Sequence, residues 1–339
     1  MLDGRFMQSA LRSLFLVCLL AAACAGASPP PAVAQEQPLD IHSSSLPFKI
    51  DEPAAKSIGR LVWRGGVSMT ANSRNFGGWS DLHVSPDGRD LTSISDEGAW
   101  FTATIDYDGE ANLSGLSGAR IGQLRGLDGK LIGTKAEADA EGMARMPDGS
   151  WLVAFERNHR LWHYQTLTST PTLLDGPAEI GRQPTNGGIE ALTALADGRV
   201  IAISEEYSER PNTVMGWIGQ PAPGGRYQWG SFSYTTIPDF RPTAIAMLPD
   251  GSFATLERAF DMVRGVRCRV MHFDASQLAP GSTVQAEELA RLASPYAVDN
   301  LEGLAATKGS RGETLLWMIS DDNFNPLQRN ILLLFELTP

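Results

Sequence analysis

The chain has 339 residues, of which 42% are hydrophobic and 20% are charged, a composition typical of a soluble globular protein with a sizeable core. Its formal net charge of −11 argues against a nucleic-acid partner, because phosphate backbones are bound by basic surfaces. An acidic surface is typical instead of a secreted soluble protein or of one that collects cations.

The first 34 residues have the pattern of a signal peptide. Arg5 and Arg12 precede an apolar run at residues 14–23, which is too short to span a bilayer comfortably. Residues 32–34 form a small-residue cleavage site, which would release a free periplasmic or secreted protein. Residues 20–24 also resemble a lipobox, which would leave a lipid anchor on Cys24. We expect an exported chain with no transmembrane span, and both processing alternatives stay open.

Residues 35–57 show no hydrophobic period and predict a linker that leads into one folded domain at residues 58–339. This domain consists of short β-like runs broken by Gly, Asp, Asn and Pro, and its best helical candidate, residues 282–292, is short. Cys268 is the one internal thiol left after processing, so we expect a buried structural cysteine and no internal disulfide. The pattern predicts an all-β fold.

An internal repeat of about 50–60 residues predicts a β-propeller. In four copies, a residue at the start of one strand lies seven positions before the Asp of an Asp-Gly pair, and the next strand ends in charged residues. The four starting residues are Ser80, Glu141, Glu190 and Thr243. A fifth copy begins at Asn300 and has a longer turn. Because Asp-Gly between two apolar runs signals a hairpin, each copy predicts one blade.

The repeats predict five blades, and a sixth, degenerate blade could occupy residues 58–78. The last strand, residues 331–337, and a strand near residues 61–63 could instead close the ring by sharing one blade.

The two strands of each repeat have similar lengths, so their charged ends return to the same end of the blade. Since the first strands of all blades line the central channel, carboxylates from different blades should converge on one mouth, with the Asp-Gly turns on the opposite face. Converging like charges repel, so the site needs a counter-charge. Arg157 and Arg258 could form internal ion pairs, or a divalent cation could bind, and oxygen ligands without His or Cys favour Ca²⁺.

Three of these segments resemble the phytase-like propeller family, often labelled "esterase-like activity of phytase". They begin at Ser80, Asp139 and Asn300 and run on to Gly98, Arg157 and Phe324. The resemblance implies an exported propeller related to calcium-dependent phytases, in which carboxylates hold Ca²⁺ and basic residues hold phosphate. Few basic residues lie near the predicted mouth, so a smaller phosphate ester, or another ester, fits better than phytate.

On these grounds we assign the candidate site residues to three roles. The predicted catalytic residues are Glu141, Asp321 and Asp96. The predicted substrate-binding residues are Arg157, Arg258 and Asn323. The predicted ligands of a Ca²⁺ cofactor are Asp81, Glu97, Glu190, Glu205 and Glu302.

The leading hypothesis is a monomeric, exported, metal-dependent hydrolase of small phosphate or carboxylic esters. The alternative is a non-catalytic propeller of the cell envelope that binds a ligand or a protein, since propellers serve both purposes.

Overall fold

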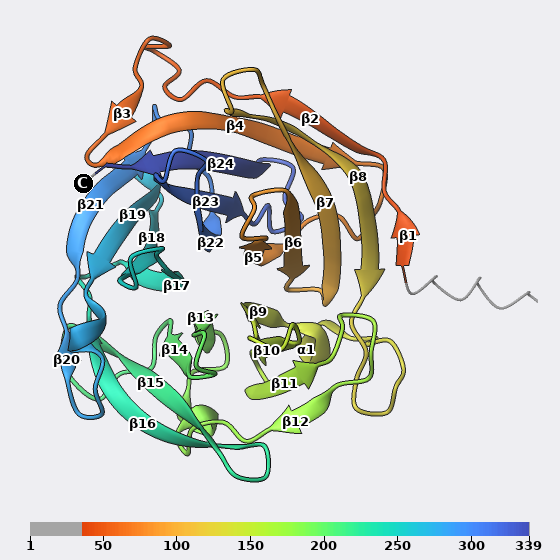
Figure 1. The fold of residues 1–339 in the computed structure, drawn as a ribbon, viewed down its shortest axis with the longest axis vertical. Coiled ribbons are helices and arrows are strands. Elements are labelled where there is room, and N and C mark those ends of the chain that lie inside the picture. The colour runs from red at the N-terminus through yellow and green to blue at the C-terminus, as the bar shows by residue number, and fades with distance from the viewer. Residues whose placement is uncertain (1–35, 339) are drawn as a thin grey trace, which may run out of the picture. The chain divides into compact units, whose positions relative to one another are not determined.

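The computed structural model describes residues 36–338, which form a ring of five β-sheets around a central channel (Figure 1). The five innermost strands, β5, β9, β13, β17 and β22, follow one another around the ring, and each contacts the innermost strand of the next blade. The prediction of an all-β propeller is confirmed, with five blades. The predicted signal peptide, with Cys24, lies outside the described residues.

Each blade is one sheet, whose strands follow one another from the channel outwards. Blade 1 consists of β5 (Trp79–Val84), β6 (Asp90–Ser95), β7 (Ala99–Tyr107), β8 (Leu113–Gln123) and β1 (Glu36–Pro38). Blade 2 consists of β9 (Ala140–Arg145), β10 (Trp151–Phe155), β11 (Arg160–Tyr164) and β12 (Thr172–Leu174). Blade 3 consists of β13 (Ile189–Ala194), β14 (Val200–Ser204), β15 (Thr213–Ala222), β16 (Arg226–Thr235) and β20 (Thr283–Val284).

The last two blades complete the ring. Blade 4 consists of β17 (Arg241–Met247), β18 (Phe253–Asp261), β19 (Gly265–Phe273) and β21 (Glu287–Ala293). Blade 5 consists of β22 (Leu301–Lys308), β23 (Thr314–Ser320), β24 (Asn330–Leu337), β4 (Leu61–Ala71) and β2 (Ile41–Ser45), and β3 (Ser57–Ile58) pairs with β4. The connections contain one short helix, α1 (Lys135–Ala138), and two 3₁₀ turns, η1 (Ile180–Arg182) and η2 (Ala275–Gln277).

The ring closes because strands from the two ends of the domain share blade 5. β4 pairs antiparallel with β24, with Val67 opposite Leu332 and Leu61 opposite Leu337. Residues 58–78 therefore complete the fifth blade and form no sixth one. Closure within one sheet ties the beginning of the domain to its end.

The interpretation of residues 35–57 as a linker is wrong for the strands that it contains. β1 pairs with β8 on the outer edge of blade 1, and β2 pairs with β4 on the outer edge of blade 5. These outer strands are held mainly by backbone hydrogen bonds to one neighbouring strand, and most of their side chains are exposed. Their sequences therefore lack a hydrophobic period. Residues 282–292 likewise contain β20 and the outer strand β21 in place of the expected helix.

The core is divided into five hydrophobic clusters, one between each pair of neighbouring blades. Between blades 5 and 1, Trp79 packs on Phe101 with a ring-centroid distance of 4.5 Å, and Trp317 is completely buried. Burying one such large side chain stabilises the fold by roughly 2–3 kcal/mol. The blades are therefore held face to face by apolar packing, which leaves the channel to polar groups.

The five inner hairpins turn in the same way, at the end of the ring away from the charged strand ends. In each, a glycine with a φ of +74° to +89° donates its N–H to the carbonyl three residues earlier, at 2.8–2.9 Å. These glycines are Gly88, Gly149, Gly198, Gly251 and Gly312. Glycine adopts this left-handed conformation without steric cost, which explains the repeated Asp-Gly pairs.

None of the helices in the described part of the chain reaches the length and apolarity that a membrane span needs.

Candidate functional site

A β-bulge occurs at the same place in all five inner strands. The pairing with the second strand of each blade shifts by one residue there, and one residue of the inner strand is left without a partner. These residues are Ser80, Glu141, Glu190, Thr243 and Glu302. A bulge re-aims a side chain, and it is a common feature beside active sites. Three blades thereby present a glutamate at this level of the channel.

A second layer of charged residues lies one position beyond the residue of each second strand that pairs just before the bulge; in four blades the paired part ends there, and in blade 4 the pairing continues through Arg258. Its members are Asp96, Glu156, Glu205, Arg258 and Asp321. In four blades the backbone N–H of this residue donates to a carbonyl just before the inner strand, at 2.8–2.9 Å. Blade 4 differs, because it carries Arg258 where the other four blades carry a carboxylate.

The two layers meet around a cavity of about 220 Å³ at one mouth of the channel. Its lining includes seven carboxylates and one guanidinium, contributed by Asp96, Glu141, Glu156, Glu190, Glu205, Glu302, Asp321 and Arg258. Ser80, Asn186 and Asn323 complete the wall. The predicted convergence of carboxylates from separate blades on one mouth is confirmed.

Arg258 supplies the counter-charge on the blade 4 side of the cavity. Its Nε lies 2.9 Å from Glu302 Oε1, and its Nη2 donates to Glu205 Oε1 at 3.4 Å. Attraction to Glu302 raises the pKa of Arg258 above its ordinary value, so the guanidinium stays charged. The predicted internal ion pair of Arg258 is confirmed. Because the guanidinium is committed to two glutamates, its predicted role in binding substrate stays a prediction.

Burial outweighs these interactions, and the pKa values of the cavity carboxylates rise, including that of Glu302 beside Arg258. Burial raises the pKa of Glu156 to about 7, with the nearby Glu205 charge adding to the effect. Burial also raises the pKa of Asp321 to about 7 and that of Glu302 to about 8. The same cause, reinforced by neighbouring carboxylates, raises the pKa values of Glu141 and Glu190 well above their ordinary value. Without a cation, the cavity therefore holds protons near neutral pH.

Two overlapping sets of carboxylates are close enough to hold a metal ion. In the first set Asp139, Glu141 and Glu156 bring one oxygen each within 4.8 Å of one another, and in the second Glu156, Glu190 and Glu205 do the same. Glu156, which belongs to both sets, is 5% exposed and accepts hydrogen bonds from the Gly187 and Gly188 N–H groups at 2.6 and 2.5 Å. These two donors fix its position.

Two buried carboxylate oxygens in the cavity have no hydrogen-bond partner among the described residues. They are Glu190 Oε2 and Asp96 Oδ1. A buried oxygen without a partner is costly, since it has lost its water and received nothing in exchange. Oxygen donors of this kind are the ligands that Ca²⁺ and Mg²⁺ prefer. The donor set therefore fits a hard divalent cation, and it contains neither His nor Cys.

A side pocket of about 480 Å³ adjoins the cavity and shares Asp96, Glu141 and Glu156 with it. Asp139 forms ion pairs with Lys135 from α1, at 2.8 Å, and with Arg157. Lys135 also pairs with Asp96. Arg157 is partly exposed and has a φ of +57°, so the predicted internal ion pair exists but leaves this guanidinium facing the pocket.

The chain matches the model of the family Phytase-like, described as "Esterase-like activity of phytase", over residues 74–324. The match spans well over half of the chain and covers every carboxylate of the cavity. The chain belongs to this family. No curated protein matches the phytase-like chain.

Solved structures with a similar arrangement include an α-L-arabinofuranosidase and an endo-arabinase. An α-L-arabinofuranosidase from Podospora anserina, in complex with cellotriose, is 12% identical, with a TM-score of 0.49 over 83% of this chain and 98% of that chain. An endo-arabinase from Bacteroides thetaiotaomicron is 9% identical, with a TM-score of 0.47 over 78% and 94% of the two chains.

The assignment of Asp81 as a metal ligand needs correction. Asp81 is buried away from the cavity, and its Oδ2 accepts a hydrogen bond from Met143 N–H of blade 2 at 2.7 Å, while its Oδ1 accepts one from Leu82 N–H at 2.7 Å. The bulge places Ser80, the preceding residue, in the cavity of the phytase-like propeller instead. Asp81 therefore joins neighbouring inner strands and is unavailable to a metal.

Glu97 also lies outside the inner cavity. It is exposed and lines the side pocket. Glu190, Glu205 and Glu302 do line the cavity, and Glu190 and Glu205 belong to a potential metal set. The predicted catalytic residues Glu141, Asp321 and Asp96, and the predicted substrate ligand Asn323, line it as well.

Sequence reasoning assigned no site role to six residues that line the cavity or the side pocket: Ser80, Lys135, Asp139, Glu156, Asn186 and Phe324. Glu156 has the same offset from its Asp-Gly pair as Glu205, so the repeat itself contained the signal. Asp139 lies two residues before the bulge residue of its blade, within a segment that already resembled the family. Lys135 and Asn186 come from connections between blades, where no repeat or motif marks them.

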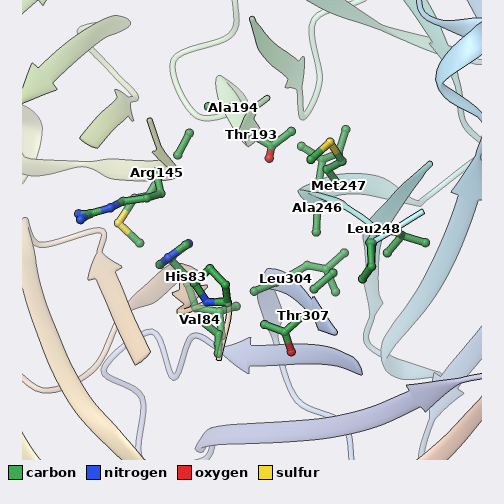
Figure 2. A pocket seen from close by; sticks show the side chains of 18 of the residues that line it. His83, Val84, Arg145, Thr193, Ala194, Ala246, Met247, Leu248, Leu304 and Thr307 are labelled. Carbon is green, nitrogen blue, oxygen red and sulfur yellow. The ribbon is translucent and has the colours of Figure 1, made fainter. Parts of the chain in front are cut away.

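The opposite mouth of the channel has a different chemistry (Figure 2). A pocket of about 430 Å³ is lined there by the later residues of the same five inner strands, including Val84, Ala194, Met247 and Leu304. None of the described residues lining it is acidic. Burial lowers the pKa of His83 in this wall to about 4, so its imidazole is neutral at pH 7. The carboxylates that line the channel thus gather at one mouth, as the repeat predicted.

Proposed function

We propose that this phytase-like propeller hydrolyses esters of small molecules, phosphate or carboxylic, at its acidic mouth with a divalent cation bound, and that the cation is Ca²⁺. The observation that carries the proposal is the buried cavity lined by seven carboxylates with one balancing guanidinium. Such an excess of like charge costs folding energy unless a ligand offsets it. A cavity that keeps so many carboxylates in spite of this cost in folding energy is best explained by the binding of a cation.

The residues proposed to hold the cation are Asp139, Glu141 and Glu156 on one side of the cavity, or Glu156, Glu190 and Glu205 on the other. The unpartnered Glu190 Oε2 favours the second set for the tighter site. The chemistry that such a cation supplies is Lewis-acid polarisation of an ester oxygen and acidification of water.

The other residues are proposed to bind and orient the ester. Asp96 and Asp321 flank the blade 1 and blade 5 side, where each can hold or pass on the proton that water loses as it adds to the ester. Arg157 and Asn323 border the side pocket, where they can donate hydrogen bonds to an anionic oxygen. Hydrolysis then releases the alcohol and the free acid, with water supplying one hydrogen to the alcohol and an OH to the acid.

The size and charge of the mouth favour a small ester. Lys135 is committed to Asp96 and Asp139, and Arg258 to Glu205 and Glu302. Arg157 is therefore the cation best placed to contact an incoming anion. A ligand with many phosphate groups would find few partners at this mouth.

We also propose that the chain is exported and acts as a monomer, either free or with a lipid on Cys24. The N-terminal sequence pattern supports export, and an oxygen-only cation site suits compartments rich in Ca²⁺. Mass spectrometry of the mature N-terminus distinguishes the two forms, since cleavage after Ala34 leaves Gln35 first and lipidation leaves Cys24 first. An unprocessed Met1 would contradict export.

The test combines binding with turnover. Calorimetric titration with Ca²⁺ should give saturable binding, and p-nitrophenyl phosphate, phytate and p-nitrophenyl acetate should be assayed with Ca²⁺ or chelator. The Glu141→Gln and Asp321→Asn variants should lose activity at least roughly 100-fold. The matched control is Glu287→Gln, an exposed glutamate on the outer strand of blade 4, which should keep it. Binding of Ca²⁺ without turnover of any ester would favour the non-catalytic propeller.

A further inference from the structure

The loop after β23 holds two consecutive non-glycine residues in the left-handed region. Asn323 and Phe324 both have a φ of +48°. Residues with a side chain rarely adopt this conformation, and a bulky residue such as phenylalanine adopts it least readily. Strained backbone of this kind persists only where the surroundings enforce it, and it gathers at ligand-binding sites.

Two aspartates enforce the strained conformation. Asp321 Oδ1 accepts a hydrogen bond from Asn323 N–H at 2.5 Å, and Asp322 Oδ1 accepts one from Phe324 N–H at 3.1 Å. Asp322 is itself held by Gly78 N–H at 3.0 Å and by Asn330 Nδ2 at 2.9 Å. The loop is therefore fixed to blade 1 as well as to its own blade.

Two glycines of blade 1 make room for the Phe324 ring. A Cβ at Gly77 would lie 3.0 Å from Phe324 Cε1, and a Cβ at Gly78 would lie 2.7 Å from Phe324 Cε2. The same Cβ at Gly78 would collide with Asp96 Oδ1. The ring edge and this carboxylate oxygen are thus neighbours, and the oxygen is one of the two in the cavity without a partner among the described residues.

The ring is held in place without being buried. Phe324 is 42% exposed and lines the side pocket. Phe76, which directly precedes the glycine pair in the sequence, instead packs on Trp79 and Phe101 in the core, at centroid distances of 5.1 and 5.5 Å. Among residues 36–338, no ring–ring contact involves Phe324. Its aromatic surface therefore remains available to a ligand.

We propose that Phe324 is a specificity-determining residue that stacks on a flat ring in the leaving group of the substrate, so the preferred esters are those of aromatic or similarly planar ring alcohols. The inference rests on the proposed function. With the ester group at the carboxylate cavity, the leaving group extends into the side pocket, where Phe324 forms one wall. A flat ring stacked on Phe324 has a larger contact area and more favourable electrostatic interactions with it than an alkyl group has.

The experiment measures binding, so that it does not depend on turnover. Phenylphosphonate and methylphosphonate, which cannot be hydrolysed because carbon replaces the ester oxygen, are titrated into the full-length protein saturated with Ca²⁺. The wild type should bind phenylphosphonate about five- to tenfold more tightly. Phe324→Ala and Phe324→Leu should lose most of this preference, and Phe324→Tyr should keep it. Leu327→Ala, in the same loop and 89% exposed, is the matched control and should resemble the wild type.

The outcomes separate the two proposals. Equal affinity for the two phosphonates, or a preference that survives in Phe324→Ala, overturns the role of the ring and leaves the hydrolase proposal intact. Failure of both phosphonates to bind in the presence of Ca²⁺ overturns this inference and the phosphate-ester form of the proposed function, whereas the carboxylic-ester form is judged by the turnover of p-nitrophenyl acetate. The Phe324→Leu variant keeps the apolar volume, so its loss of preference would show that the planar ring is what matters.

Discussion

Arg258 Nε lies 2.9 Å from Glu302 Oε1, and Arg258 stands where each of the other four blades has an aspartate or a glutamate. The inner strand of the same blade carries Thr243 where three others carry glutamate. Blade 4 therefore contributes positive charge and no carboxylate to the cavity. The ring is asymmetric in charge, with its carboxylates concentrated on blades 2, 3 and 5 and at Asp96 of blade 1.

Removal of this guanidinium should destabilise the cation-free protein. Arg258→Met leaves Glu302 and Glu205 without their counter-charge, and breaking a buried ion pair from one side costs roughly 3–5 kcal/mol. Urea unfolding at pH 8 with chelator measures the loss. The control Arg264→Met breaks exposed pairs on the same blade and should cost less than about 1 kcal/mol. Equal losses in the two variants would contradict the counter-ion role.

Glu190→Gln should have opposite effects on stability and on cation binding. In the cation-free protein it removes one of several carboxylates that repel one another, so the melting temperature should rise by a few degrees. It also removes a ligand oxygen, so the stabilisation that Ca²⁺ gives should fall by more than half. Differential scanning calorimetry with chelator and with saturating Ca²⁺ gives both numbers. A variant that melts lower without Ca²⁺ and responds to it normally would disprove both roles.

The stability of the cation-free protein should decrease between pH 5 and pH 8.5. The pKa values of Glu156 and Asp321 are raised to about 7 and that of Glu302 to about 8, so the folded protein holds protons that the unfolded chain has already released. For such acids the stability is greatest below the unfolded pKa and is lost as the pH rises through the folded pKa.

The expected decrease in melting temperature is on the order of 5 °C over this range. Saturating Ca²⁺ should reduce it, because the cation favours the ionised carboxylates. Calorimetry at fixed ionic strength, on protein stripped of metal, measures both curves. A melting temperature that is constant or rises between pH 5 and pH 8.5 would show that ionisation of these carboxylates does not destabilise the folded protein.

Asp81→Ala should destabilise the fold and leave cation affinity unchanged. It removes the acceptor for the Leu82 and Met143 N–H groups, and leaving such donors unpaired in the core costs about 1–3 kcal/mol each. Asp81→Asn keeps an acceptor oxygen and should cost less. Urea unfolding and Ca²⁺ titration test this, and a tenfold loss of Ca²⁺ affinity in Asp81→Asn would return Asp81 to the metal site.

The contrast between Asp81 and Ser80 shows where sequence reasoning reached its limit. The seven-residue spacing to the Asp-Gly pair aligns Ser80 with Glu141 and Glu190, and the structure follows that spacing. The acidic side chain of Asp81 suggested a ligand although it lies one residue off. A shift of one residue moves a side chain to the other face of a strand, so residue type was a poorer guide than register.

The blades, their hairpins and the end of the ring at which the charges gather could all be predicted from the amino-acid pattern. Those features are local, since they follow from strand periodicity and from the glycine that each turn requires. Only the folded ring shows which carboxylate oxygens have no partner among the described residues, that Arg258 pairs with Glu302 and Glu205, and that Lys135 and Phe324 reach the mouth from separate loops. The pairing of β1 and β2 with the outer edges of two blades was likewise visible only in the folded ring. These outcomes depend on contacts between residues far apart in the chain, for which no local pattern exists.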